Sequence, residues 1–229
     1  TTTPRPRPSR GVFMSNHSSA AAALAFFVGT MAGVIWSNPA SADTGAPVCA
    51  TADEAALIAA AYAKTPAPMP FQAAAKLKLS EAAVMSGLGA KRGVGVASGE
   101  FGKVWASLAE WPEAVTMIIK DAHIFEIHGQ VPKGEPSTRS KFFNLAHDGQ
   151  ALGGHLRPDL ISAIYAIDIA GGEGPVRGVA FLDANGASSF SVFVPPAEGE
   201  DKAPSPANAH FDKTRALMAS MPALCAAKP

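Results

Sequence analysis

The sequence predicts an α+β fold, in which a small N-terminal helical part precedes a large antiparallel β-sheet with packed helices. Apolar residues recur at helical spacing between residues 51 and 88, and short apolar runs rich in β-branched and aromatic residues follow between residues 114 and 194. The connections between these runs carry no helical pattern. This favours antiparallel pairing, because parallel strands need a long crossover connection.

Three short helices are expected at the start of the folded part. The first is capped by Asp53 and reaches Ala61, and three prolines between Thr65 and Pro70 separate it from a second helix over Phe71–Leu77. A third covers residues 80–85. Helices joined by a turn resemble a DNA reader, but the segment has few basic residues, so structural packing is favoured over groove recognition.

An amphipathic helix is predicted over Glu100–Glu110. Phe101, Trp105 and Leu108 recur on one face of it, and Pro112 ends it. A stripe of this kind is more typical of a protein core than of a cofactor contact.

Strands are expected in the apolar runs Ala114–Lys120, Ala122–Gly129, Lys141–Ala146, Leu160–Asp168, Val176–Leu182 and Ser188–Val194. The last two are joined by Asp183-Ala184-Asn185-Gly186, whose Asn-Gly pair is typical of a hairpin turn. A final helix over Asn208–Met221 can pack across the sheet through Phe211, Leu217 and Met218.

An export signal is predicted at the N-terminus. Residues 20–35 form an apolar stretch, and Ala40-Ser41-Ala42 has the small-x-small pattern of a cleavage site. The stretch is shorter than the roughly 20 residues of a spanning helix. We therefore expect a mature start near Asp43 and a periplasmic or secreted protein without stable membrane insertion after cleavage; an uncleaved anchor is the alternative. The expected organisation is an N-terminal extension with a signal (1–42), a helical part (43–98), the antiparallel-sheet domain (99–221) and a tail (222–229).

The chain has two cysteines, Cys49 and Cys225, one near each end of the expected mature chain. In an oxidising compartment they are predicted to form one disulfide. Closing so long a loop contributes about 5 kcal/mol in the chain-entropy model. Two unpaired thiols in flexible tails are the alternative.

Charge and motifs exclude several classes of function. Lys+Arg number 19 and Asp+Glu 19, so the net positive charge of a nucleic-acid binder is missing. The sequence has no zinc-ligand spacing, P-loop or nucleophile elbow. The Gly-rich stretch Gly93-Val94-Gly95-Val96 lacks the helix-opening context of a dinucleotide site.

A set of ordered motifs resembles the HutX/ChuX family of haem-utilisation carrier proteins, over roughly Phe71 to Met221. The most specific are Phe142-Phe143-Asn144-Leu145 and Leu152-Gly153-Gly154-His155-Leu156. The others are Trp105, Trp111 with Val115-Thr116, Glu126-Ile127-His128-Gly129, Val131-Pro132-Lys133-Gly134 and Phe181-Leu182-Asp183-Ala184-Asn185-Gly186.

The resemblance implies a homodimeric α+β protein that binds haem as cargo and exchanges it with a donor or acceptor protein. It also implies a relation to larger two-repeat proteins, some of which degrade haem.

Residue by residue, His155 matches the family histidine that follows the Gly pair and is implicated in haem ligation. A second histidine used by some members falls, by ungapped count from Trp111, on Ile119. The nearest substitutes in sequence are Lys120, His123 and His128, and strand alternation places the two histidines on opposite faces.

Haem binding requires an axial ligand, an apolar slot and cations for the propionates. His155 can supply the ligand, and is the expected metal-binding residue. The slot can come from Phe142, Leu145, Leu152, Leu156 and Ile164, and the cations from Arg139, Lys141 and Arg157. A histidine held by hydrogen bonds at a turn is the alternative for His155.

The function predicted is that of an exported haem carrier, buffer or scavenger without catalytic activity. Haem degradation is the alternative from a different class, and a non-binding interaction module is a third.

Overall fold

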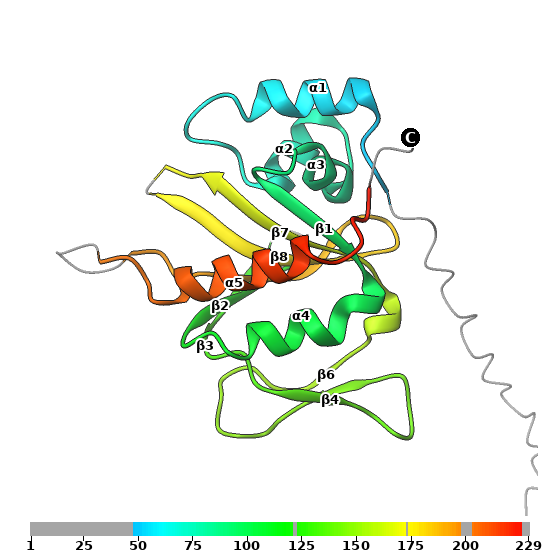
Figure 1. Cartoon of the computed structure of the whole chain (residues 1–229), viewed down its shortest axis with the longest axis vertical. Coiled ribbons are helices and arrows are strands. Elements are labelled where there is room, and N and C mark those ends of the chain that lie inside the picture. The colour runs from blue at the N-terminus through cyan, green and yellow to red at the C-terminus, as the bar shows by residue number, and fades with distance from the viewer. Residues whose placement is uncertain (1–47, 121–122, 173, 198–202, 226–229) are drawn as a thin grey trace, which may run out of the picture. The chain divides into compact units, whose positions relative to one another are not determined.

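A six-stranded sheet with strand order β1-β7-β8-β9-β2-β3 lies at the centre of the structure (Figure 1). Every neighbouring pair is antiparallel, which confirms the predicted α+β class. The strands are β1 (Gly93–Ala97), β2 (Ala114–Lys120), β3 (His123–Gly129), β7 (Ile161–Ala170), β8 (Pro175–Asp183) and β9 (Ser188–Phe193).

The computed structural model describes residues 48–120, 123–172, 174–197 and 203–225. The predicted signal and its cleavage site at residues 40–42 lie outside the described residues. Within the described ranges, no helix is long and apolar enough to cross a membrane.

A second sheet of three short antiparallel strands holds the residues of the candidate site. It consists of β4 (Gly134–Pro136), β5 (Phe143–Leu145) and β6 (His155–Leu156) in that order. We call it the small sheet. The strand predicted over Lys141–Ala146 is therefore shorter in the structure, and β4 and β6 have no counterpart among the predicted strands.

Strand β1 was also missed. The Gly93–Val96 stretch is an edge strand of the main sheet, paired with β7. Tight packing requires glycine in this strand, because a Cβ on Gly95 would overlap the ring of Tyr165. Glycine weakens strand propensity, so the sequence pattern alone did not indicate a strand here.

Three helices pack against one face of the main sheet: α1 (Ala52–Ala61), α2 (Pro70–Leu77) and α3 (Glu81–Gly87). Asp53 was wrong as the cap of α1. The cap is Thr51, which forms a capping box with Glu54: the Glu54 backbone N–H donates to Thr51 Oγ1 (3.3 Å), and the Thr51 N–H donates to Glu54 Oε2 (2.7 Å). This box satisfies two backbone donors, whereas Asp53 lies inside the first helical turn.

The opposite face is covered by the 3-10 turn η1 (Ser98–Glu100), α4 (Phe101–Leu108), α5 (Ala207–Ala219) and the small sheet. Trp105 and Trp111 are buried here, as the predicted core stripe requires. Their indole N–H groups donate to Pro132 O and Thr214 Oγ1, both at 3.0 Å. Burying an aromatic of this size contributes about 1.5–3 kcal/mol to folding.

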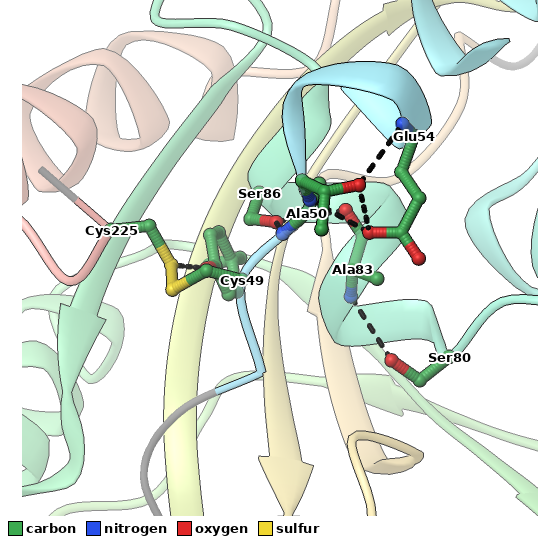
Figure 2. The surroundings of a disulfide bond; sticks show 9 residues. Cys49, Ala50, Glu54, Ser80, Ala83, Ser86 and Cys225 are labelled. Atoms are coloured by element: carbon green, nitrogen blue, oxygen red, sulfur yellow. Dashed lines mark hydrogen bonds between the residues drawn. A yellow bond between two sulfur atoms is a disulfide. The ribbon is translucent and has the colours of Figure 1, made fainter. Parts of the chain in front are cut away.

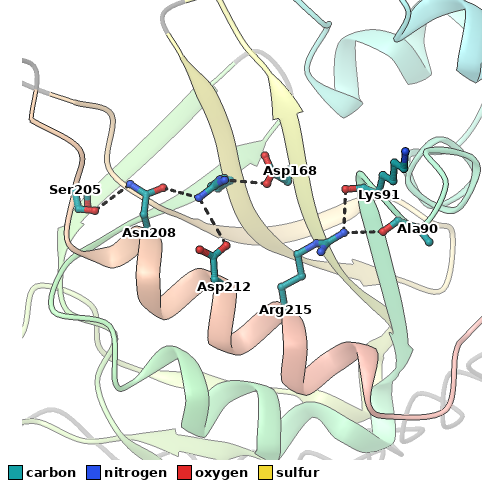
Figure 3. Close-up of polar contacts among 8 residues, drawn as sticks. Ala90, Lys91, Asp168, Ser205, Asn208, Asp212 and Arg215 are labelled. Carbon is teal, nitrogen blue, oxygen red and sulfur yellow. Dashed lines mark hydrogen bonds and ion pairs between the residues drawn. The ribbon is translucent and has the colours of Figure 1, made fainter.

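Helix α5 contacts the sheet through Phe211 and Met218, as predicted, but Leu217 is 37 % exposed. Residues 211, 214 and 218 share one helical face, and residue 217 falls outside it. Thr214 takes the buried position instead. Asn208 and Asp212 of the helix contact Arg177 of β8 (3.2 and 3.7 Å). Figure 3 shows Arg215 reaching the backbone oxygens of Ala90 and Lys91, which precede β1.

The predicted disulfide is present. Cys49 and Cys225 are bonded across a sequence separation of 176 residues (Figure 2). The predicted hairpin turn at Asp183–Gly186 is also present, with Gly186 at φ +75°, where glycine is favoured.

Candidate functional site

The small sheet has one face in the core and one face outside. On β5 and β6, Phe143 is paired with Leu156 and Asn144 with His155. Phe143 and Leu156 pack into the core beneath α4, so alternation places Asn144 and His155 on the outer face. Phe142 precedes β5 and is 40 % exposed, whereas Phe143 is 6 % exposed.

His155 is held in a defined orientation. Its Nδ1 lies 2.9 Å from Asn144 Oδ1, and its ring centroid is 5.8 Å from that of Phe142. An amide oxygen can only accept, so Nδ1 carries the hydrogen and donates it. In the neutral imidazole this leaves the lone pair on Nε2. A histidine fixed in this way has the tautomer and direction that a metal ligand needs.

Charged residues surround this pair. The Arg157 guanidinium lies over the Phe142 ring, 5.6 Å from its centroid, and donates to both carboxylate oxygens of Asp159 at 2.6 and 2.7 Å. Lys141 Nζ lies 3.5 Å from Asp159 Oδ2. The hydrogen bond from Arg157 and the positive charges nearby hold the pKa of Asp159 below its usual range. Two cations therefore share one carboxylate at the edge of the outer face.

A surface hollow of about 540 Å³ adjoins the site. Its walls include Lys141, Phe142 and Asp159 from the site, and Phe101 and Gly102 from the start of α4. The apolar slot predicted from five residues is not formed as expected. Leu145 and Ile164 are buried in the core, and Leu152 and Leu156 pack against it, which leaves Phe142 on the outer face.

The structure thus brings together His155, Phe142, Arg157 and Lys141. Arg139 lies exposed in the preceding loop. Among the described residues, no group of three or more His, Cys, Asp or Glu side chains could hold a metal ion.

His123 and His128 lie elsewhere, on the exposed edge strand β3. They are paired with Lys120 and Val115 of β2, five positions apart, so they face opposite sides as predicted. His128 Nε2 lies 3.5 Å from Glu126 Oε2, and the ring of His123 is 6.5 Å from that of Phe125. No contact in the described chain joins either histidine to His155.

Ile119 lies on the side of the main sheet that carries α2 and α3, in a small apolar pocket with Met85 and Ile167. The small sheet packs on the other side. The two positions matched to family histidines are therefore separated by the main sheet within one chain.

Asn144 and Asp159 were not recognised from the sequence as parts of the site. Asn144 belongs to the Phe-Phe-Asn-Leu motif and to the strand predicted over Lys141–Ala146, shortly before His155 in the sequence. This position was the one sequence feature that could have pointed to it. Only the pairing of β5 with β6 sets Asn144 opposite His155.

The sequence around this site matches a known protein family. The model of the haem utilisation ChuX/HutX family matches residues 94–213, more than half of the chain. The chain belongs to the ChuX/HutX family. The matched range contains the small sheet and His155, and it leaves out α1–α3 and both cysteines.

Solved structures share the ChuX/HutX fold. A protein from Erwinia carotovora is 26% identical with a TM-score of 0.61, and the match covers 74% of this chain and 98% of that one. The heme binding protein ChuX is 18% identical, with a TM-score of 0.61 and coverage of 73% and 99%. ChuS, an E. coli heme oxygenase, is 14% identical with a TM-score of 0.56, and this chain covers 50% of its length. A comparison with curated protein sequences finds no match.

Proposed function

We propose that this ChuX/HutX protein binds haem as cargo on the outer face of the small sheet, with His155 Nε2 as an axial ligand, and acts as an exported carrier, buffer or scavenger. The observation that carries this proposal is the His155–Asn144 hydrogen bond of 2.9 Å within the family-matched range. This hydrogen bond engages Nδ1 and leaves Nε2 as the nitrogen that can bind iron.

The residues around His155 fit a porphyrin. Phe142 offers an exposed aromatic face, and Arg157 and Lys141 offer positive charge for the propionates. Asp159 already neutralises part of that charge, so propionate binding would compete with an existing ion pair. Such competition suits a protein that must release its cargo.

The openness of the face also supports a carrier more than an enzyme. His155 and Phe142 are exposed, and the adjoining hollow is open to solvent. Catalytic sites commonly exclude water around the reacting groups. An open face instead allows a donor or acceptor protein to approach the haem.

The test is a haemin titration of the protein followed by absorbance. We expect saturable binding with a Soret band that changes when His155 is replaced by Ala. If the wild-type protein shows no saturable binding, haem carriage is excluded, and a non-binding interaction module becomes the better description.

Haem degradation is the second candidate, because ChuS, an E. coli heme oxygenase, shares the fold. Adding a reductant and oxygen to the haem complex distinguishes the two. A carrier keeps its Soret band when catalase is present, whereas a degrading enzyme loses it and yields a defined tetrapyrrole product.

We propose an extracytoplasmic location because the Cys49–Cys225 disulfide fits an oxidising compartment. The proposed mature chain begins near Asp43. Expression of the gene in a bacterial host and mass measurement of the periplasmic or secreted product would test this. A product that retains residues 1–42 would contradict it.

We also propose a homodimer, with β3 as part of the interface. β3 is an edge strand, and Ile124 and Phe125 on it are 56% and 55% exposed. Exposed apolar residues on an open edge favour association with another strand. Light scattering should show a dimer that Ile124→Lys with Phe125→Lys converts to a monomer; a monomeric wild-type protein would contradict the proposal.

A further inference from the structure

The disulfide connects the residue before α1 with the segment that follows α5. Helix α1 contains one fully buried residue, Ile58, which packs against Gly87, and the buried Tyr62 follows its last turn. Most of the other α1 side chains are exposed or half-buried, and Leu57 is 55% exposed. Elements with few buried contacts unfold locally at low cost.

The N-terminal end of α1 is held by polar contacts and by the disulfide. The Ala50 N–H donates to Ser86 Oγ at 2.7 Å, and Cys49 is bonded to Cys225 directly before it (Figure 2). On the other side of the bond, the Leu224 N–H donates to Gly95 O at 3.0 Å, on the edge strand β1. The disulfide therefore holds α1 and residues 222–225 in place together.

Helix α5, which precedes residues 222–225, does not depend on the disulfide. Arg215 donates to the backbone oxygens of Ala90 and Lys91 at 2.6 and 2.9 Å (Figure 3), and Phe211 and Met218 are fully buried. On the C-terminal side, breaking the disulfide would thus free the residues after α5 and leave the helix in place. Behind these residues lies a hollow of about 380 Å³, walled by Leu224 and Cys225 on one side and by Met85, Val94 and Tyr165 on the other.

The two cysteines differ in their surroundings. Residue Cys49 is exposed, whereas residue Cys225 is partly buried and its Sγ lies 3.3 Å from the Tyr165 hydroxyl. A disulfide sulfur carries no hydrogen, so the phenol donates. Burial raises the pKa of Tyr165 to about 12, which keeps it protonated at neutral pH.

We propose that the Cys49–Cys225 disulfide is a latch that small-molecule thiols open in the native protein. A thiolate attacks Sγ of the exposed residue Cys49 and forms a mixed disulfide with it. The bond to Cys225 breaks, and Cys225 leaves as a thiolate that accepts the Tyr165 hydrogen bond. A second thiol then releases Cys49, so that one disulfide and two thiols become two cysteines and one small-molecule disulfide. Opening detaches α1 and residues 222–225 and uncovers the hollow and the outer edge of β1. The proposal does not rest on haem binding.

The first test identifies the attacked sulfur. The native protein is treated with glutathione, free thiols are blocked with iodoacetamide, and peptides are mapped by mass spectrometry. We expect the initial product to carry glutathione on Cys49 and the alkyl group on Cys225. Glutathione on Cys225, or no reaction without denaturant, would overturn the proposal.

The second test measures the role of Tyr165. Losing one hydrogen bond to the leaving sulfur should slow reduction of Tyr165→Phe by about three- to tenfold. The control is Tyr62→Phe, because Tyr62 is buried in the same cluster and its hydroxyl has no hydrogen-bond partner among the described residues. Equal rates in the two variants would show that Tyr165 does not assist the leaving sulfur.

The third test separates a latch from a purely structural bond. Hydrogen exchange is compared between the oxidised protein and a Cys49→Ser, Cys225→Ser double variant. We expect residues 48–62 and Leu224 to exchange about tenfold faster or more in the variant, while β7, β8 and α5 stay unchanged. Unchanged exchange in 48–62, or faster exchange throughout the chain, would overturn the latch.

Discussion

The small sheet and the edge strand β3 both expose a histidine beside an aromatic ring, but only the histidine of the small sheet has its ring orientation fixed by a hydrogen bond among the described residues. His155 lies 5.8 Å from Phe142 and has its Nδ1 bound by Asn144, with Arg157 and Lys141 nearby. On β3, His123 lies 6.5 Å from Phe125, and no acceptor in the described chain fixes its ring.

This difference indicates which histidine is prepared for a ligand. Fixing the ring before binding removes part of the conformational entropy cost of ligation, and it also selects the nitrogen that faces the ligand. An exposed histidine without an orienting partner must meet that cost when it binds. The comparison therefore favours His155 over His123. His128 has a partner, but the contact occupies its Nε2, 3.5 Å from Glu126 Oε2. The following variants test this preference for His155.

Replacing His155 with Ala should have the largest effect. Removal of the imidazole that Asn144 fixes on the outer face should weaken haemin binding by about 100-fold and shift the Soret band. Absorbance titration of the wild-type protein and the variant measures both. An unchanged affinity would place the haem elsewhere on the molecule.

Replacing Asn144 with Leu should have the next largest effect. The variant keeps the side-chain volume but removes the acceptor of the His155 hydrogen bond, and we expect about tenfold weaker binding. Asn144→Asp retains an acceptor and should restore most of the affinity. If both variants bind equally weakly, the hydrogen bond is not what orients His155.

Replacing Asp159 with Asn should strengthen haemin binding by about three- to tenfold, because Arg157 and Lys141 would then be available to the propionates. Haemin dimethyl ester, which lacks free carboxylates, is the control ligand and should show no gain. Weaker binding of haemin to the variant would mean that Asp159 positions the two cations and does not compete for them.

The same carboxylate sets a direction for pH dependence. The folded-state pKa of Asp159 is lowered, so its ion pair contributes to stability above the unfolded carboxyl pKa of about 3.9 and is lost as pH falls through the lower folded value. Near neutral pH the ion pair persists. Competition with propionates is therefore expected throughout the neutral range.

Replacing His123 and His128 together with Ala should have the smallest effect, below about twofold on haemin affinity, since exposed contacts of this kind contribute little. The same titration measures it. A large loss would reverse the comparison, and would be explained if the proposed dimer places β3 of one chain near the small sheet of another.

The sequence was informative where local patterns agree with the environment. β2 begins and ends where the apolar run predicted, and the Asn-Gly turn joins β8 to β9. The sequence pattern did not predict β1, β4 and β6. Strands β1 and β4 contain glycine, β4 also contains proline, and β6 has only two residues. These strands exist because tertiary pairing outweighs weak local propensity.

The same limit applies to the candidate site. Motif order indicated His155, and charge near it indicated Lys141 and Arg157. The sequence gives no local signal that Leu145 faces the core while Asn144 faces outward, because the register of β5 against β6 decides this. The Asp159 contacts depend likewise on how the 3-10 turn η2 (Pro158–Leu160) follows β6.

Trp105 packs against the inner face of strand β5. Its ring is 6.0 Å from that of Phe143, on the inner side of the same small sheet whose outer side carries His155. A porphyrin on the outer face would sit within energy-transfer distance of this indole and quench its emission. If haem binds as proposed, the protein contains its own optical reporter, and tryptophan fluorescence would follow haem binding and release in real time without any added label.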